Sequence, residues 1–374
     1  RKENSQRRKK SLKHKFLALT SFIFMILFLG GCTQNQQLHQ KLIVQGVGIE
    51  KEEKNYKVMV QALDFQNPLN ENEPNTKVIE TTGETVTEAL DNISKQTSLT
   101  AVYSQNLILI LGEKAAKFGV NDFIDFFIRH CETRPKVKIC ISKTVFDILK
   151  INPNNKSLKS KNIHDLVPLQ LNSDVLHFVS SLKNEKTDPF AAWIEMEDKK
   201  EVHLKGAGIF NQDKLESLLE GKEAFGFMAL KGTPKFGSLV VNSEETGDVT
   251  CRIEKVIPKI SAKVNENDMP EFEISLDTTA SSFSLDKNFY THDPQQITEI
   301  IEESFSKNLT EICQNLLKKT LQSKIDVFDF AKILKNSNPK YFKKIEGNWK
   351  EILPNLNCKV SVKTKLKVTG KEPV

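Results

Sequence analysis

The first thirty-two residues constrain this chain most, because they decide which part of it can fold in water. A basic run ends at Lys15, and residues 16–29 form an apolar run interrupted only by two hydroxyl residues. Small residues and Cys32 follow. A positive segment, a short apolar segment and a small-residue cleavage site are the parts of a secretory signal peptide. The apolar run is shorter than the roughly 20 residues of a membrane span. We therefore predict that residues 1–31 are a removable signal peptide.

The residues at the predicted cleavage site make this signal more specific. Leu29-Gly30-Gly31-Cys32 resembles the lipobox of bacterial lipoproteins. In that family a peptidase cuts between Gly31 and Cys32, and the cysteine receives a diacylglycerol on sulfur and an acyl chain on nitrogen. The resemblance implies anchoring at the outer face of the cytoplasmic membrane, with residues 32–41 as a short tether and no other cofactor. The alternative is an ordinary signal peptide with an incidental cysteine.

The leader also accounts for the basic character of the chain, whose sequence pI is 8.8. Residues 1–31 hold 8 of the 54 Lys and Arg but only 1 of the 48 Asp and Glu, which leaves 46 and 47 in the remainder. A basic domain would suggest nucleic acid as a partner. Because the remainder is nearly neutral, we do not predict nucleic acid as a partner.

The remaining residues are too many for one core, and their patterning predicts an α+β fold of three mixed domains. We expect an N-terminal α/β domain at 42–198, a small middle domain at 199–246 and a C-terminal α+β domain at 247–374. Within the middle domain, residues 212–220 are expected to form a helix that Gly221 ends. Residues 152–161 are expected to be a loop, and residues 244–248 a linker.

The C-terminal domain carries the clearest patterns. Asp293-Pro294 suits a helix N-cap followed by the first helical position, and opens a long amphipathic stripe. A shorter helix is expected at 327–334. Residues 360–368 alternate strictly between apolar and polar, which predicts a half-buried strand. We expect an antiparallel sheet packed against the long helix.

Motifs spread over the chain together resemble the Ger(x)C family of spore-germination lipoproteins, the C subunits of nutrient germinant receptors. The segments that carry the resemblance are Gly46-Val47-Gly48-Ile49-Glu50, residues 105–120, Arg129-His130-Cys131-Glu132-Thr133-Arg134, Lys205-Gly206-Ala207-Gly208-Ile209-Phe210, Asp326-Val327-Phe328-Asp329-Phe330, Pro339-Lys340 and Trp349. One departure is Thr33-Gln34, where the family usually has Trp-Asp after the lipobox cysteine.

The resemblance implies three α+β domains and no catalytic activity. It also implies assembly with two integral-membrane partners, the A and B subunits, at the inner membrane of a dormant spore. We expect a non-enzymatic receptor subunit required for nutrient-triggered germination. The alternatives are a solute-binding lipoprotein of a transporter, which has two similar α/β lobes, and an envelope hydrolase.

Arg129, Glu132 and Arg134 form the most prominent polar group. Arg129 and Glu132 are three residues apart and can pair on one helix face. We favour a structural ion pair before Pro135 over a contact with a partner protein.

Other motifs argue against common chemistries. The pairs Gly46/Gly48 and Gly206/Gly208 lie within expected strands and lack a third glycine, so close packing or a bulge explains them better than dinucleotide binding. Lys231-Gly232-Thr233 lacks the upstream glycine of a P-loop. No catalytic triad or metal-ligand spacing is present, and no small-molecule ligand is predicted. Most of the five sparse cysteines are expected to be small buried hydrophobes, with a Cys131–Cys140 disulfide left open.

Overall fold

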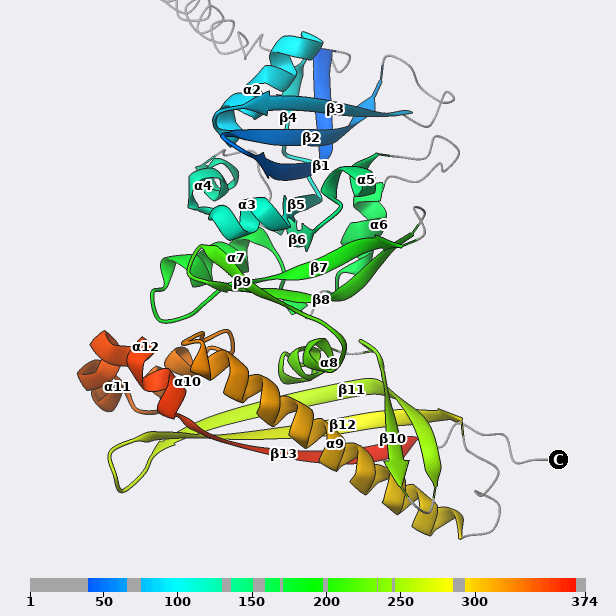
Figure 1. The fold of residues 1–374 in the computed structure, drawn as a ribbon, viewed down its shortest axis with the longest axis vertical. Helices are drawn as coiled ribbons and strands as arrows, with labels where there is room; N and C mark the ends of the chain where they lie inside the picture. Colours follow the sequence, from blue (N-terminus) through cyan, green and yellow to red (C-terminus); the bar gives the residue numbers. More distant parts are fainter. Residues whose placement is uncertain are drawn as a thin grey trace, which may run out of the picture. The chain divides into compact units, whose positions relative to one another are not determined.

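The computed structural model describes residues 40–65, 75–129, 136–150, 159–168, 171–197, 201–233, 235–243, 246–284 and 293–367. Its elements, drawn in Figure 1, are β1 (Lys41–Glu52), β2 (Asn55–Asp64), β3 (Asn75–Gly83), α2 (Val86–Thr97), β4 (Thr100–Val102), β5 (Ile108–Gly112), α3 (Glu113–Phe118), α4 (Asn121–Arg129), β6 (Lys138–Ser142), α5 (Val145–Leu149), α6 (Lys159–Leu166), α7 (Val175–Lys183), β7 (Phe190–Glu197), β8 (Glu201–Asn211), β9 (Lys214–Leu219), α8 (Gly221–Leu230), β10 (Ser238–Ser243), β11 (Gly247–Val264), β12 (Pro270–Ser284), α9 (Pro294–Gln322), α10 (Phe330–Ser337), α11 (Pro339–Ile345), η4 (Glu346–Asn348), α12 (Trp349–Ile352), η5 (Leu353–Asn355) and β13 (Asn357–Lys367).

The first sheet has the order β3-β2-β1-β5-β6-β7-β8-β9, with β4 also paired to β1. Strands β1, β5, β6 and β7 run parallel, and antiparallel strands extend the sheet on both sides. Every residue of β5 and β6 is buried, as expected for parallel strands covered on both faces. Helices α2, α3, α4 and α7 contribute to the core on one face, and α5 and α6 to the core on the other.

The second sheet has the order β10-β11-β12-β13. Its first three strands are antiparallel, and β13 runs parallel to β12. The parallel pairing follows from the long connection through α9 to η5, because a tight turn can only join antiparallel strands. Helix α9 crosses this sheet in Figure 1 and buries the apolar stripe predicted from the sequence: Ile297, Ile301, Phe305, Leu309, Ile312 and Leu316.

The α+β fold class predicted from the sequence is confirmed, and its last region is a sheet packed against a long helix. The side chain of Asp293 accepts a hydrogen bond from the backbone N–H of Gln295, so the predicted N-cap of the long helix is present. The glycine pairs lie within β1 and β8, as expected. A β-carbon added to Gly48 would come within 2.6 Å of Val145 and 2.7 Å of Leu149, which makes close packing the reason for glycine there.

Three local predictions were wrong. Residues 214–219 form strand β9 rather than a helix, because Gln212, with a φ of 56°, lies in a tight turn that returns the chain along β8. Of the expected linker at 244–248, Gly247 and Asp248 pair with β10 as the start of β11, whereas residues 244–245 lie outside the described residues. Residues 159–161 begin helix α6, whereas the rest of the expected loop lies outside the described residues.

The strands of the expected middle domain, 199–246, are divided between the sheets: β8 and β9 belong to the first and β10 to the second. Helix α8 follows β9 and is buried from Ala224 to Leu230. One continuous hydrophobic core includes residues of β8, of α8 and of the second sheet. Within the part of the chain that the structure describes, no helix has the length and apolar character needed to cross a bilayer.

Candidate functional site at the junction of the two sheets

The carboxylate of Asp326 is the most deeply buried charged group at the junction. Its two oxygens accept hydrogen bonds from the backbone N–H groups of Phe330 and Ala331, each at 2.8 Å, at the start of α10. The indole N–H of Trp349 donates a third, at 3.2 Å. The carboxylate thus satisfies N–H groups that a helix start leaves unpaired, and fixes the position of α12 relative to α10.

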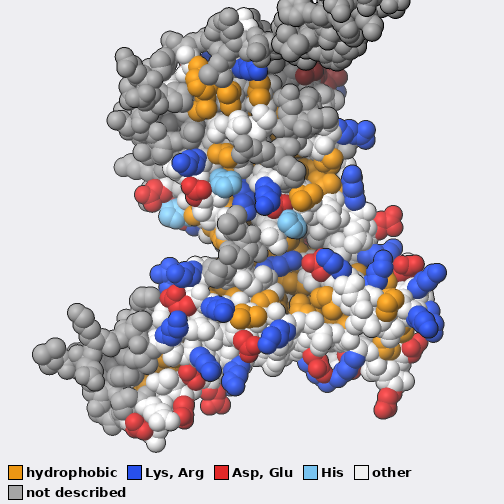
Figure 2. Space-filling view, turned by 180° about the vertical axis from the view of Figure 1, so that it is seen from behind, with side chains coloured by type: hydrophobic (Ala, Val, Ile, Leu, Met, Phe, Trp, Pro, Cys, Tyr) orange, Lys and Arg blue, Asp and Glu red, His pale blue; other side chains and the backbone are white. Residues whose placement is uncertain are grey.

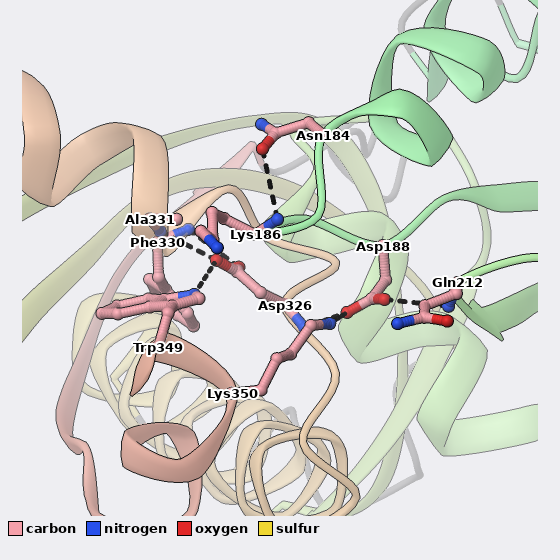
Figure 3. Close-up of polar contacts among 9 residues, drawn as sticks. All are labelled: Asn184, Lys186, Asp188, Gln212, Asp326, Phe330, Ala331, Trp349 and Lys350. Atoms are coloured by element: carbon pink, nitrogen blue, oxygen red, sulfur yellow. Dashed lines mark hydrogen bonds and ion pairs between the residues drawn. The ribbon is translucent and has the colours of Figure 1, made fainter. Parts of the chain in front are cut away.

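Asp188, in the segment before β7, contacts Asp326 before α10 and Lys350 in α12. One carboxylate oxygen of Asp188 accepts from the backbone N–H of Asp326 at 2.7 Å, and the other from that of Gln212 at 3.1 Å. The backbone N–H of Asp188 donates to the carbonyl of Asp326 at 2.9 Å. The ammonium of Lys350 forms an ion pair with Asp188, whose side chain is fully buried. Figure 3 shows these groups converging between the β7 side of the molecule and α12.

Burial dominates the electrostatics of Asp326. It raises the pKa of this carboxyl from 3.8 to about 7, although the N–H groups of Ala331, Phe330 and Trp349 favour the ionised form. Each oxygen already accepts at least one hydrogen bond, so the group serves as a fixed acceptor at a helix start. A pKa near 7 predicts that the stability of the junction depends on pH.

Lys231, at the end of α8, is a further charged side chain in this region. Figure 2 shows Lys and Arg side chains on the surface among Asp and Glu, whereas the side chain of Lys231 is only 16% exposed. Its ammonium donates to the carbonyl of Val327 at 2.6 Å and lies 4.0 Å from the Asp329 carboxylate. It also lies over the rings of Phe190, Phe227 and Phe328, 4.6 to 5.9 Å from their centroids. Burial lowers the pKa of Lys231.

Two cavities flank these groups. One of about 320 Å³ has Lys231, Phe190 and Phe328 in its wall, together with hydroxyl groups from α7. The other, of about 420 Å³, lies between the end of α7 and α10 and α11, and four lysines line it: Lys183, Lys186, Lys332 and Lys335. Lys332 lines both cavities.

The predicted site residues lie elsewhere or outside the described residues. Leu29, Gly30, Gly31 and Cys32 lie outside them, as do Glu132 and Arg134. Arg129 ends helix α4 with an exposed side chain. The ion pair between Arg129 and Glu132 therefore stays a prediction, as does lipid attachment at Cys32.

The family-like motif at 326–330 and Trp349, in contrast, are brought together by the structure. The sequence offered no signal for Asp188, Lys350 or Lys231, because each finds its partner 96 to 162 residues away. Cys140 is a free, buried thiol, and Cys131 lies outside the described residues. Burial raises the pKa of Cys140 and Cys313 to about 12, which keeps both as unreactive thiols.

Histidine, cysteine, aspartate and glutamate form no group of three suited to a metal ion among the described residues. Three histidines lie beside carboxylates: His177 is 2.8 Å from Asp174, His164 is 3.1 Å from Asp165, and His203 is 3.7 Å from Glu197. His177 also borders the smaller cavity. The contacts given above show instead that the carboxylates of Asp188 and Asp326 bind main-chain N–H groups, an indole N–H and an ammonium.

Comparisons with known proteins agree with this architecture. Residues 34–196 match the model of the spore germination protein N-terminal domain, and residues 205–370 match that of the C-terminal domain described as spore germination B3/GerAC like. Spore germination protein B3 of Bacillus subtilis (strain 168) is 24% identical, over 92% of this chain and 95% of its own length. Spore germination protein GerQC of Bacillus cereus is 19% identical, over 93% and 98%.

A solved structure has the same fold. The crystal structure of the GerBC protein matches with a TM-score of 0.59 at 21% identity, over 86% of this chain and 96% of that one. The two domain models meet close to the boundary between β7 and β8, and together they cover both sheets and the Asp326–Trp349 junction. On this evidence the chain belongs to the Ger(x)C family of spore germination proteins.

Proposed function

We propose that this protein is a non-enzymatic, lipid-anchored subunit of a spore germinant receptor. In this proposal it is required for nutrient-triggered germination and assembles with integral-membrane A and B subunits. The observation that carries the proposal is the match of both family domains, 34–196 and 205–370, directly after the lipobox-like sequence ending at Cys32. Two acyl chains on one cysteine would give stable anchoring at the outer face of the spore's inner membrane.

The polar groups of the junction support a structural rather than a catalytic role. The oxygens of Asp188 and Asp326 accept from backbone N–H groups, an indole and an ammonium. A general base or nucleophile needs a free position toward its substrate. Carboxylates committed in this way stabilise the arrangement of two sheets, which suits a subunit that presents a fixed surface to partners.

A solute-binding lipoprotein is the alternative, and the architecture disfavours it. Such proteins have two similar α/β lobes around a cleft. Here a large mixed sheet with helices on both faces is joined to a four-stranded sheet covered by α9. The two parts differ in strand order and in helix placement, so they are not two similar lobes.

Co-purification from spore membranes tests the proposal. An affinity-tagged copy would replace the native gene in a spore-forming host, and detergent extracts would be examined by mass spectrometry. We expect the A and B subunits to co-purify, and deletion of the gene to abolish the response to one set of nutrients. Normal nutrient germination in the deletion strain, together with no bound receptor subunit, would remove the proposal.

A matched cysteine pair separates anchoring from assembly. Cys32→Ala should abolish incorporation of labelled fatty acid and move the protein out of the membrane fraction. Cys358→Ala is the control, because Cys358 is a half-buried free thiol in β13 and should keep its lipid label. Equal lipid labelling of the two variants would contradict the predicted lipid attachment site.

A further inference from the structure

Lys231 has fewer hydrogen-bond partners than a buried ammonium usually has, although its ammonium also lies over the rings of Phe190, Phe227 and Phe328. An ammonium has three N–H donors, and among the described residues one of them has a hydrogen bond, to the carbonyl of Val327. The nearest carboxylate, Asp329, is 4.0 Å away and its side chain is half exposed. Buried charges are normally paired and fully hydrogen-bonded, because removing them from water is unfavourable. The site therefore has unused capacity for an anion.

The cavity beside Lys231 has the size and lining of a small-ligand site. Its volume of about 320 Å³ is at the lower end of the range for ligand pockets. The apolar part of the wall consists of Leu171, Phe190, Leu230, Val327 and Phe328. The polar part includes the serines of α7, Ser180 and Ser181, and the amide of Asn172. An apolar wall with a few convergent polar groups is typical of small-molecule sites.

The charges at the wall fix the charge of a suitable ligand. Lys231 and Lys332 contribute two positive charges, and Asp329 one negative charge. Asp188 also borders the cavity, but its charge is balanced by its ion pair with Lys350. Among the charged side chains that line the cavity, the remaining excess is one positive charge, which matches a ligand with a single negative charge better than a phosphate dianion.

We propose that this cavity binds a small monocarboxylate with an apolar body, its carboxylate meeting the ammonium of Lys231 and its body lying against Phe190 and Phe328. The carboxylate accepts the free N–H groups of Lys231, and the hydroxyls of Ser180 and Ser181 are available to its outer side. The site is made by α7 and the end of α8 together with the segment before α10. A ligand there contacts both α7, which packs on the first sheet, and the segment before α10, and so holds these two parts together. The proposed site does not depend on the receptor assembly proposed above.

Binding of benzoate to the purified full-length protein tests this site. Benzoate has one carboxylate and one ring, and benzyl alcohol matches it without the charge. We expect saturable benzoate binding by calorimetry or ligand-observed NMR at millimolar concentration, and no comparable binding of benzyl alcohol or inorganic phosphate. Benzoate that does not bind, or benzyl alcohol or phosphate that binds equally well, would overturn the proposal.

Variants locate the binding. Lys231→Met keeps the length of the side chain but removes the charge, and should weaken benzoate binding by about tenfold or more, as expected for the loss of a charge-assisted hydrogen bond. Ser180→Phe fills the cavity from an exposed position of α7 without touching the ammonium, and should weaken binding as much. If Lys231→Met does not fold, Ser180→Phe still tests the site. Lys363→Met, an exposed lysine of β13, is the matched control and should bind normally. Unchanged binding in the folded cavity variants would overturn the assignment.

Discussion

At the scale of the residue, Asp326 makes stability depend on pH. Its pKa is raised from 3.8 to about 7, so the folded chain holds this proton more tightly than the unfolded chain. The resulting contribution to the free energy of unfolding is fully present below a pH near 4 and is lost as the pH rises through about 7. A shift of this size corresponds to something on the order of 4 kcal/mol. Denaturation in urea, followed by tryptophan fluorescence between pH 4 and 8, measures it.

Asp326→Asn isolates this effect. The amide cannot titrate, and one of its two polar atoms is an NH₂ group that faces a backbone N–H instead of accepting from it. The free-energy difference between the wild type and this variant should therefore change as the pH rises, with the wild type losing stability relative to the variant. Asp277→Asn, which replaces an exposed carboxylate paired with Lys259, is the control for exchanging a carboxylate for an amide. Parallel pH curves for the wild type and Asp326→Asn would contradict the prediction.

The sequence identified some residues of the junction but not others. Asp326 and Trp349 belong to motifs that resemble the family, and they lie together in the structure. Asp188 and Lys350 have no local signal, because an acidic residue before a proline and a lysine in a short helix are common on surfaces. Their burial depends on contacts between segments 138 and 162 residues apart, which no local pattern encodes.

At the scale of the element, Gly206 in β8 is required for the packing of β9. A β-carbon at this position would collide with the backbone carbonyl of Leu219 and come within 2.9 Å of Ala224. A backbone oxygen cannot move aside like the end of a side chain. We expect Gly206→Ala to lower the free energy of unfolding by about 3 kcal/mol, near the upper end for overpacking. Gly347→Ala is the control, since nothing lies within 4 Å of its added carbon, and it should change stability by at most about 0.5 kcal/mol. Equal unfolding midpoints in urea would contradict the prediction.

The elements that the sequence predicted well are those in which one local pattern dominates. Helix α9 has a cap, a proline at its first position and a long apolar stripe, and β13 alternates between apolar and polar residues. Residues 214–219 were expected to be helical, and Leu215, Leu218 and Leu219 do have helical spacings of three and four residues, yet these residues form strand β9. The deciding feature is pairing with β8, in which Gly208 lies opposite Leu218, and this pairing is a tertiary contact.

At the scale of the whole molecule, the sequence predicted the fold class but not how the strands are shared between the sheets. Strands β8 and β10 are close in sequence, but β8 joins the first sheet and β10 the second. The buried helix α8 separates them, and its side chains pack in a core that continues into the second sheet. A helix that is apolar on all sides has no stripe to indicate which sheet it covers, so the division is visible only in three dimensions.

The ion pair of Asp188 and Lys350 connects the segment before β7 with α12, and its coupling energy can be measured. Asp188→Ala leaves the N–H groups of Gln212 and Asp326 without their acceptor and the Lys350 ammonium without its counter-ion, so we expect it to destabilise the protein by about 3–5 kcal/mol. Combined with Lys350→Met in a double-mutant cycle, it should give a coupling energy of about 1–3 kcal/mol. The exposed pair Lys259–Asp277 is the matched control and should couple by less than about 1 kcal/mol. Hydrogen exchange at the N–H of Gln212 should accelerate in Asp188→Ala, because this N–H bonds to the carboxylate directly. If the buried pair coupled no more strongly than the surface pair and this exchange rate were unchanged, the junction would not be what holds the layers together, and their shared core around α8 would have to do so alone.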